Sequence, residues 1–125
     1  MIRGWALAAT LLAACEGRPD SPPVDVDPGP VPAALAEGER TYQARCQACH
    51  GPHGVGTVQG PPLVHRYYEP SHHADEAFRF AIRFGVRPHH WHFGPMPAVG
   101  AGLDDRATSA VIKYIRWLQQ QRGIV

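Results

Sequence analysis

Two cysteines and a histidine stand together in the run Cys46-Gln47-Ala48-Cys49-His50. On a helix, residues three apart lie on the same face, so both thiols can reach one edge of a single planar cofactor. The histidine that follows then falls under that cofactor, where a neutral imidazole nitrogen can bind a metal. A porphyrin carries its two vinyl groups on one edge, and the motif therefore predicts a haem c attached through Cys46 and Cys49, with His50 as an iron ligand.

Zinc binding and thiol redox chemistry are the alternative interpretations of a Cys-x-x-Cys pair. A structural zinc site generally has a second pair of ligands at similar spacing. The chain has three cysteines, and the third, Cys15, stands apart, so only the histidine-rich stretch 65–92 could supply that pair. A thioredoxin-like motif lies in a βαβ context, of which the sequence gives no sign. Haem attachment is therefore favoured over both.

Residues 1–14 have the pattern of an export signal. Arg3 supplies a positive start, and the apolar run 5–14 has ~10 residues, well short of the ~20 needed to span a bilayer. The run ends in LAAC, which resembles a bacterial lipobox, where a precursor is lipidated on cysteine and cleaved just before it. We expect lipidation of Cys15. The alternative is an ordinary signal peptide with an incidental cysteine, and the mature protein is exported in both cases.

A proline-rich and acidic segment, residues 15–32, follows the signal. Proline cannot donate to helix or sheet ladders, and in polyproline geometry the chain rises ~3.1 Å per residue. We interpret the segment as a lipid-anchored tether for one domain, residues 33–125. The net charge of +1 indicates no nucleic-acid partner, and 125 residues are too few for separate cofactor and substrate domains.

Three helices are expected in the domain. The first covers 33–45, where apolar and small residues recur at spacings of three and four. The second covers about 74–84, with Gly85 beyond its end. The third starts at Asp104 or Asp105, whose carboxylates suit a helix N-terminus, and Gly123 closes it. Its apolar stripe consists of Val111, Tyr114, Ile115 and Leu118.

From about Leu35 to Leu118 the chain resembles class I c-type cytochromes. In that family an N-terminal helix with a glycine crosses a C-terminal helix with an aromatic residue, and Gly38 and Tyr114 fit these positions. The resemblance implies an all-α cytochrome c fold, with three to four helices around a covalently bound haem and the N- and C-terminal helices crossing.

The resemblance also implies two residues around the iron. Pro61, in Gly60-Pro61-Pro62-Leu63, would present its carbonyl to the second nitrogen of the His50 imidazole, which fixes the tautomer of a ligand. Met96, in Phe93-Gly94-Pro95-Met96-Pro97, would be the sixth iron ligand, which raises the reduction potential. The alternatives are a core methionine and a histidine ligand from the neighbouring loop.

Six of the eight histidines crowd into one stretch of the chain. Individually, each is expected to be a solvated or core residue, but together they support a hypothesis of copper or zinc binding near the haem edge, or of proton relay coupled to reduction. They are His65, His72, His73, His89, His90 and His92.

The resemblance implies an electron carrier, not an enzyme, that passes single electrons between transient donor and acceptor proteins. Such a carrier can also be a subunit of a respiratory or oxidoreductase system. We expect it in the periplasm, tethered through Cys15 to the inner or the outer membrane. The alternatives are a haem sensor or haem enzyme with an open sixth position, and a metal-binding protein that uses the histidines while its haem is structural.

Overall fold

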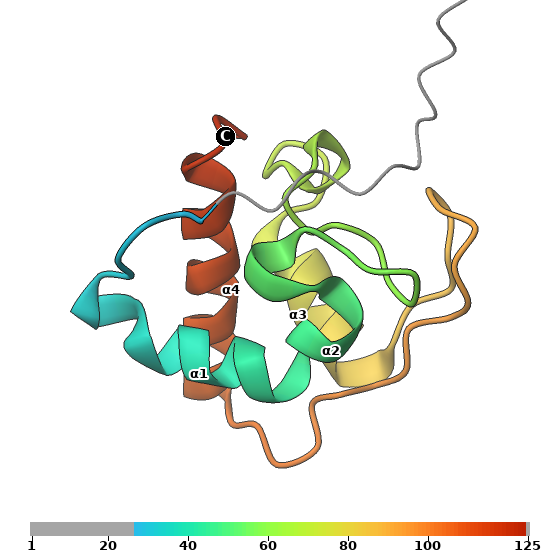
Figure 1. The fold of residues 1–125 in the computed structure, drawn as a ribbon. Helices are drawn as coiled ribbons and strands as arrows, with labels where there is room; N and C mark the ends of the chain where they lie inside the picture. The colour runs from blue at the N-terminus through green and yellow to red at the C-terminus, as the bar shows by residue number, and fades with distance from the viewer. Residues whose placement is uncertain (1–26, 125) are drawn as a thin grey trace, which may run out of the picture.

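The computed structural model describes residues 27–124, so the predicted signal peptide, Cys15 and most of the tether lie outside the described residues. The elements in this range are helical (Figure 1). They are the 3₁₀ turn η1 (Ala33–Leu35), α1 (Ala36–Arg45), α2 (Gln47–His50), the 3₁₀ turns η2 (Pro52–Gly54) and η3 (Arg66–Tyr68), α3 (Asp75–Phe84) and α4 (Asp105–Gln120). The prediction of an all-α fold is confirmed.

Helices α1 and α4 cross, and α1 contacts α4 at Ala110 and Tyr114 (Figure 1). Gly38 permits the crossing, because a Cβ at this position would collide with the carbonyl oxygen of Ala110 and lie 2.9 Å from the Cβ of Tyr114. Tyr42, one helical turn later, is fully buried and packs against Tyr114 with ring centroids 5.5 Å apart. The predicted pairing of a glycine with an aromatic residue is therefore confirmed.

The sequence of α4 determines where it starts and which face it buries. The Asp104 carboxylate accepts a hydrogen bond of 2.7 Å from the Ala107 backbone N–H, so Asp104 is the N-cap and Asp105 the first helical residue. All four residues of the predicted apolar stripe are buried, together with Ile112 and Gln119. This face forms the centre of the hydrophobic core, against α1, α3 and the loop residues Leu63 and Val64.

Helix α2 follows α1 after a single break at Cys46. The two helices meet there because Cys46 leaves regular helical geometry, with φ −119°. The Tyr42 hydroxyl donates a hydrogen bond of 2.7 Å to the Gly51 carbonyl, just beyond the end of α2. A buried hydroxyl bonded to a helix-end carbonyl satisfies both groups, and it fixes α2 relative to α1.

The long connection 85–104 leaves the end of α3 and returns beneath the molecule to α4 (orange in Figure 1). Two contacts attach it to α3: the backbone N–H groups of Val99 and Gly100 donate to the Ile82 carbonyl at 3.0 and 2.9 Å. The predicted middle helix is confirmed, with Ala74 as N-cap and Gly85 as C-cap. Among residues 27–124 no helix is long and apolar enough to cross a bilayer.

Candidate haem site

A cavity of about 420 Å³ lies between α2, α3, α4 and the 85–104 connection. This volume falls in the range of ~300–1,000 Å³ that is usual for cofactor pockets. Four of the residues predicted from the sequence line it together, namely Cys46, His50, Pro61 and Met96. The rest of the wall is mainly apolar and includes Leu63, Phe78, Phe80, Ile82, Val86, Trp91, Phe93 and Ile115.

His50 is 7% exposed and its ring is oriented by one bond. Its Nδ1 lies 2.9 Å from the Pro61 carbonyl oxygen. Because a carbonyl can only accept, Nδ1 carries the proton and Nε2 keeps its lone pair. Burial lowers the pKa of His50, and the bond to Pro61 partly opposes this. The imidazole is therefore neutral at neutral pH, which is the form that binds a metal.

Gly60 brings Pro61 to this position. A Cβ on Gly60 would lie 2.8 Å from the Cys49 carbonyl oxygen, so only glycine allows the 57–61 loop to approach α2 this closely. The Thr57 hydroxyl holds the same loop by donating to the Cys49 carbonyl at 2.7 Å. The glycine before the proline thus has a packing role that the sequence pattern alone does not explain.

The two cysteines of the motif differ in environment. Cys46 is buried in the cavity wall, whereas Cys49 is exposed. Burial raises the pKa of the Cys46 thiol to about 11. A protonated, buried thiol is a poor nucleophile, so the environment of Cys46 disfavours thiol redox chemistry.

Met96 is held by its backbone opposite Val86. The two residues form an isolated antiparallel bridge, in which each backbone N–H donates to the other's carbonyl at 3.0 Å. This pairing joins the start and the later part of the 85–104 connection and holds Met96 at the cavity. The thiol of Cys46 just before α2, a neutral imidazole from α2, a thioether from the connection and an apolar wall together fit a haem.

The comparisons with known proteins agree with this fit. The family described as "Cytochrome C oxidase, cbb3-type, subunit III" matches residues 33–115, more than half of the chain. The fold and site define a class I c-type cytochrome, with covalently bound haem c and a function in haem-based electron transfer. The chain belongs to this family of cytochrome c domains.

One solved structure with a similar fold is the c-type cytochrome XoxG from Methylobacterium extorquens AM1. The match has a TM-score of 0.57 and 24% sequence identity, and it covers 71% of this chain and 52% of that one. The chain thus spans about half the length of this protein, and the likeness supports the fold alone. No curated protein sequence matches the chain.

The histidines are divided between the cavity and the surface. His73, His89 and His90 line the cavity, so the stretch that could supply a rival iron ligand does reach the site. His65 caps η3 and accepts a hydrogen bond of 3.2 Å from the Tyr67 backbone N–H. His92 is exposed, and His53 is partly exposed in η2 with φ +52°.

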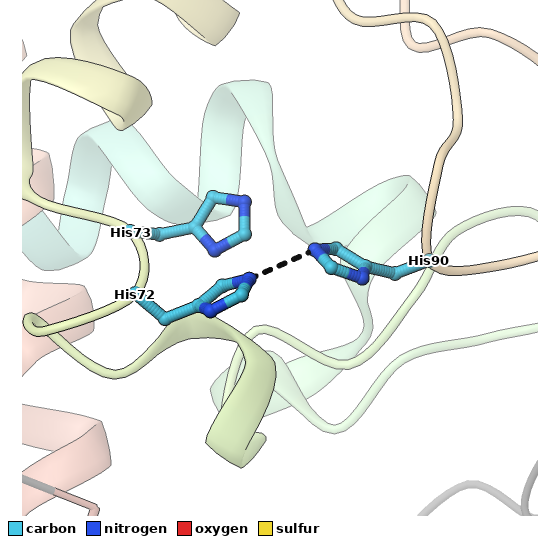
Figure 2. A group of neighbouring side chains, drawn as sticks. All are labelled: His72, His73 and His90. Carbon is cyan, nitrogen blue, oxygen red and sulfur yellow. Dashed lines mark hydrogen bonds between the residues drawn. The ribbon is translucent and has the colours of Figure 1, made fainter.

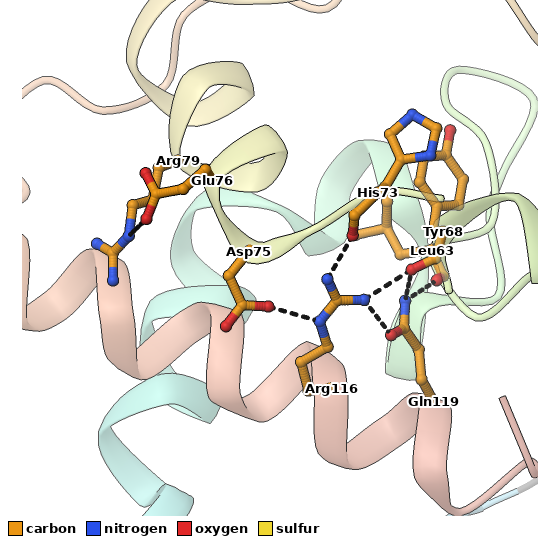
Figure 3. Close-up of polar contacts among 8 residues, drawn as sticks. All are labelled: Leu63, Tyr68, His73, Asp75, Glu76, Arg79, Arg116 and Gln119. Carbon is orange, nitrogen blue, oxygen red and sulfur yellow. Dashed lines mark hydrogen bonds and ion pairs between the residues drawn. The ribbon is translucent and has the colours of Figure 1, made fainter. Parts of the chain in front are cut away.

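A polar network centred on Arg116 was not predicted from the sequence (Figure 3). Its guanidinium donates to Asp75 Oδ1 at 2.8 Å, to the Tyr68 carbonyl at 2.7 Å and to the His73 carbonyl. Gln119, fully buried on the same helix, donates to the carbonyls of Leu63 and Tyr68 at 2.9 and 3.1 Å. These bonds fix the loop before α3, which forms one side of the cavity.

Replacing Arg116 by lysine should destabilise the protein by about 2 kcal/mol, because one ammonium cannot reproduce the planar fork and partly buried carbonyls lose a charged donor. The Arg116 side chain is 12% exposed, so water cannot easily replace it. The measurement is denaturant unfolding of the haem-loaded protein. Arg106→Lys is the matched control, because Arg106 pairs with Glu37 at the surface with 80% side-chain exposure. An equal effect of both variants would contradict the role given to the network.

Proposed function

We propose that the chain is a one-electron carrier whose haem is attached through Cys46 and Cys49, with His50 and Met96 as the axial iron ligands. When bound, the haem supplies an iron that alternates between the ferric and ferrous states. The observation that carries the proposal is that His50 and Met96 line one cavity, where Pro61 fixes the His50 ring and Val86 fixes the Met96 backbone through hydrogen bonds.

The protein contributes position and exclusion of water. Pro61 orients the imidazole and makes its free nitrogen more basic. The Val86–Met96 bridge holds the loop that carries the thioether. If His50 and Met96 both held the iron, no ligand position would be left for a substrate. Their hydrogen bonds to Pro61 and Val86 would limit movement of both side chains, which suits electron transfer.

The exposed edge of the site is the proposed point of electron exchange. Cys49 is exposed, and Val58, in the loop bonded to the Cys49 carbonyl through Thr57, is 95% exposed. An apolar tip beside an exposed attachment point suits a small, weak contact, as transient redox partners require. The donor and the acceptor would dock here in turn.

Met96→His should lower the reduction potential by tenths of a volt, since histidine in place of methionine stabilises the ferric state and axial ligands move the potential over a range of about 0.8 V. Film voltammetry measures it, and the unchanged protein should give one reversible one-electron wave. His90→Gln is the control, because His90 lines the same cavity. A large upward shift in His90→Gln with no change in Met96→His would assign the sixth position to histidine.

We further propose that the domain is held in the periplasm by a lipid on Cys15, as the signal-like run and the LAAC sequence suggest. Cys15→Ser should move the protein from the membrane fraction to the soluble periplasmic fraction of an expressing bacterium. Incorporation of labelled fatty acid should be lost in parallel. A protein that stays soluble with Cys15 intact would refute the anchor and leave the electron-transfer proposal untouched.

A further inference from the structure

Three imidazoles meet at the rim of the haem cavity (Figure 2). His72 and His73 come from the loop before α3, and His90 comes from the 85–104 connection on the opposite side. One ring nitrogen of each lies within 4.8 Å of those of the other two. The segments are far apart in sequence, so the fold brings these side chains together.

The hydrogen bonds leave each ring a nitrogen that can bind a cation. His73 Nδ1 lies against the Tyr67 carbonyl oxygen and must donate to it, which leaves His73 Nε2 unprotonated. The Nε2 atoms of His72 and His90 lie 3.2 Å apart and can share only one proton. When a cation replaces that proton, both nitrogens become ligands. A histidine that donates its other ring N–H to a backbone carbonyl is the usual arrangement at metal sites.

The spacing matches a tetrahedral ion. Two nitrogens at ~2.0–2.1 Å from zinc lie about 3.3 Å apart in tetrahedral geometry, close to the 3.2 Å between His72 and His90. The ring nitrogen of His73 lies within 4.8 Å of the other two. A side-chain rotation that moves this nitrogen by about 1.5 Å or less brings it to the same spacing. A set made only of imidazoles favours zinc or copper over magnesium or calcium.

The charges nearby are compatible with a cation. Burial, and then repulsion from neighbouring histidines, lowers the pKa of His90, and burial is also the main cause that lowers the pKa of His73. Both shifts favour the neutral imidazole, which is the form that binds a metal. Arg116, whose positive charge also acts on His73, donates to the His73 carbonyl and is already paired with Asp75 at 2.8 Å.

We propose that His72, His73 and His90 bind one Zn²⁺ ion, with the fourth position open to solvent. The ion joins the loop before α3 to the 85–104 connection. Because His73 and His90 also line the haem cavity, its positive charge disfavours the ferric state and raises the reduction potential. The site does not depend on Met96 being an iron ligand.

The test is a titration of the haem-loaded protein, produced without a histidine tag, with Zn²⁺ alone. One equivalent should bind, and His72→Gln and His90→Gln should each weaken binding at least about tenfold, since even loss of an outer-shell partner costs 10–100-fold. His92→Gln is the matched control, because His92 is exposed and two residues from His90. Binding well below one equivalent, or equal weakening by His92→Gln, would overturn the site.

The reduction potential gives an independent readout. Zinc is redox-silent, so an upward shift of the haem potential on adding Zn²⁺ reports the nearby charge, and the shift should vanish in the His72→Gln/His90→Gln double variant. The covalent haem content of that variant should equal that of the parent, which shows that the domain folds and retains its haem. Binding with no shift in potential would refute the placement at the haem rim.

Discussion

The double variant Cys46→Ala/Cys49→Ala is expected to lose covalent haem completely. The two thiols are the groups in residues 27–124 that can form thioethers, and the buried one lines the cavity. Without them the haem is held only by its iron ligands and apolar contacts, and the small domain loses a large part of its core. Haem staining of the denatured protein and mass spectrometry measure the loss.

Alanine is the right replacement at Cys46, because serine would place a hydroxyl in an apolar wall. The single variant Cys49→Ala serves as the control, since Cys46 alone can keep one linkage. Haem that remains bound to the denatured double variant would show that attachment does not run through this motif.

Gly38→Val is expected to destabilise the fold by about 3 kcal/mol or more, at the upper end of overpacking effects. The valine Cβ would collide with the Ala110 backbone, and it would lie 2.9 Å from the Tyr114 Cβ. Neither atom belongs to a flexible side-chain end, so α1 and α4 must move apart. For a domain with roughly 5–15 kcal/mol of total stability, this loss is a large share of the free energy of unfolding, so the unfolding midpoint should fall markedly.

Denaturant unfolding of the haem-loaded protein measures this effect. Ala44→Val is the matched control, since Ala44 is exposed on α1 and receives the same β-branched side chain. The control should stay within about 1 kcal/mol of the parent, the cost of a β-branched residue in a helix. Equal midpoints for Gly38→Val and the parent would contradict the close crossing of the two helices.

The sequence was informative where a signal is local. The Asp104 cap, the apolar stripe of α4 and the glycine after α3 each depend on residues that are close in the sequence, and all three are as predicted. The first helix was predicted over 33–45, but it opens with the 3₁₀ turn Ala33–Leu35 before α1, because helix ends depend on geometry that propensity does not fix.

The rest depends on contacts between distant segments. Arg116 lies on α4 among apolar neighbours, and its partners Tyr68 and His73 are more than forty residues away. The Val86–Met96 bridge and the meeting of His72 with His90 are likewise set by the path of the 85–104 connection. Sequence periodicity does not predict these contacts. For the Arg116 network and the Val86–Met96 bridge, the partners are backbone groups, which every residue type carries.

The central claim, that His50 and Met96 fill the coordination sphere of the iron in an electron carrier, is tested most directly by absorption spectroscopy of the haem-loaded protein. Spectra are recorded in the ferric form and in the ferrous form before and after carbon monoxide is added. We predict a weak far-red band from sulfur on ferric iron and a ferrous spectrum that carbon monoxide does not change. A missing band together with ready binding of carbon monoxide would contradict the claim and indicate an open sixth position.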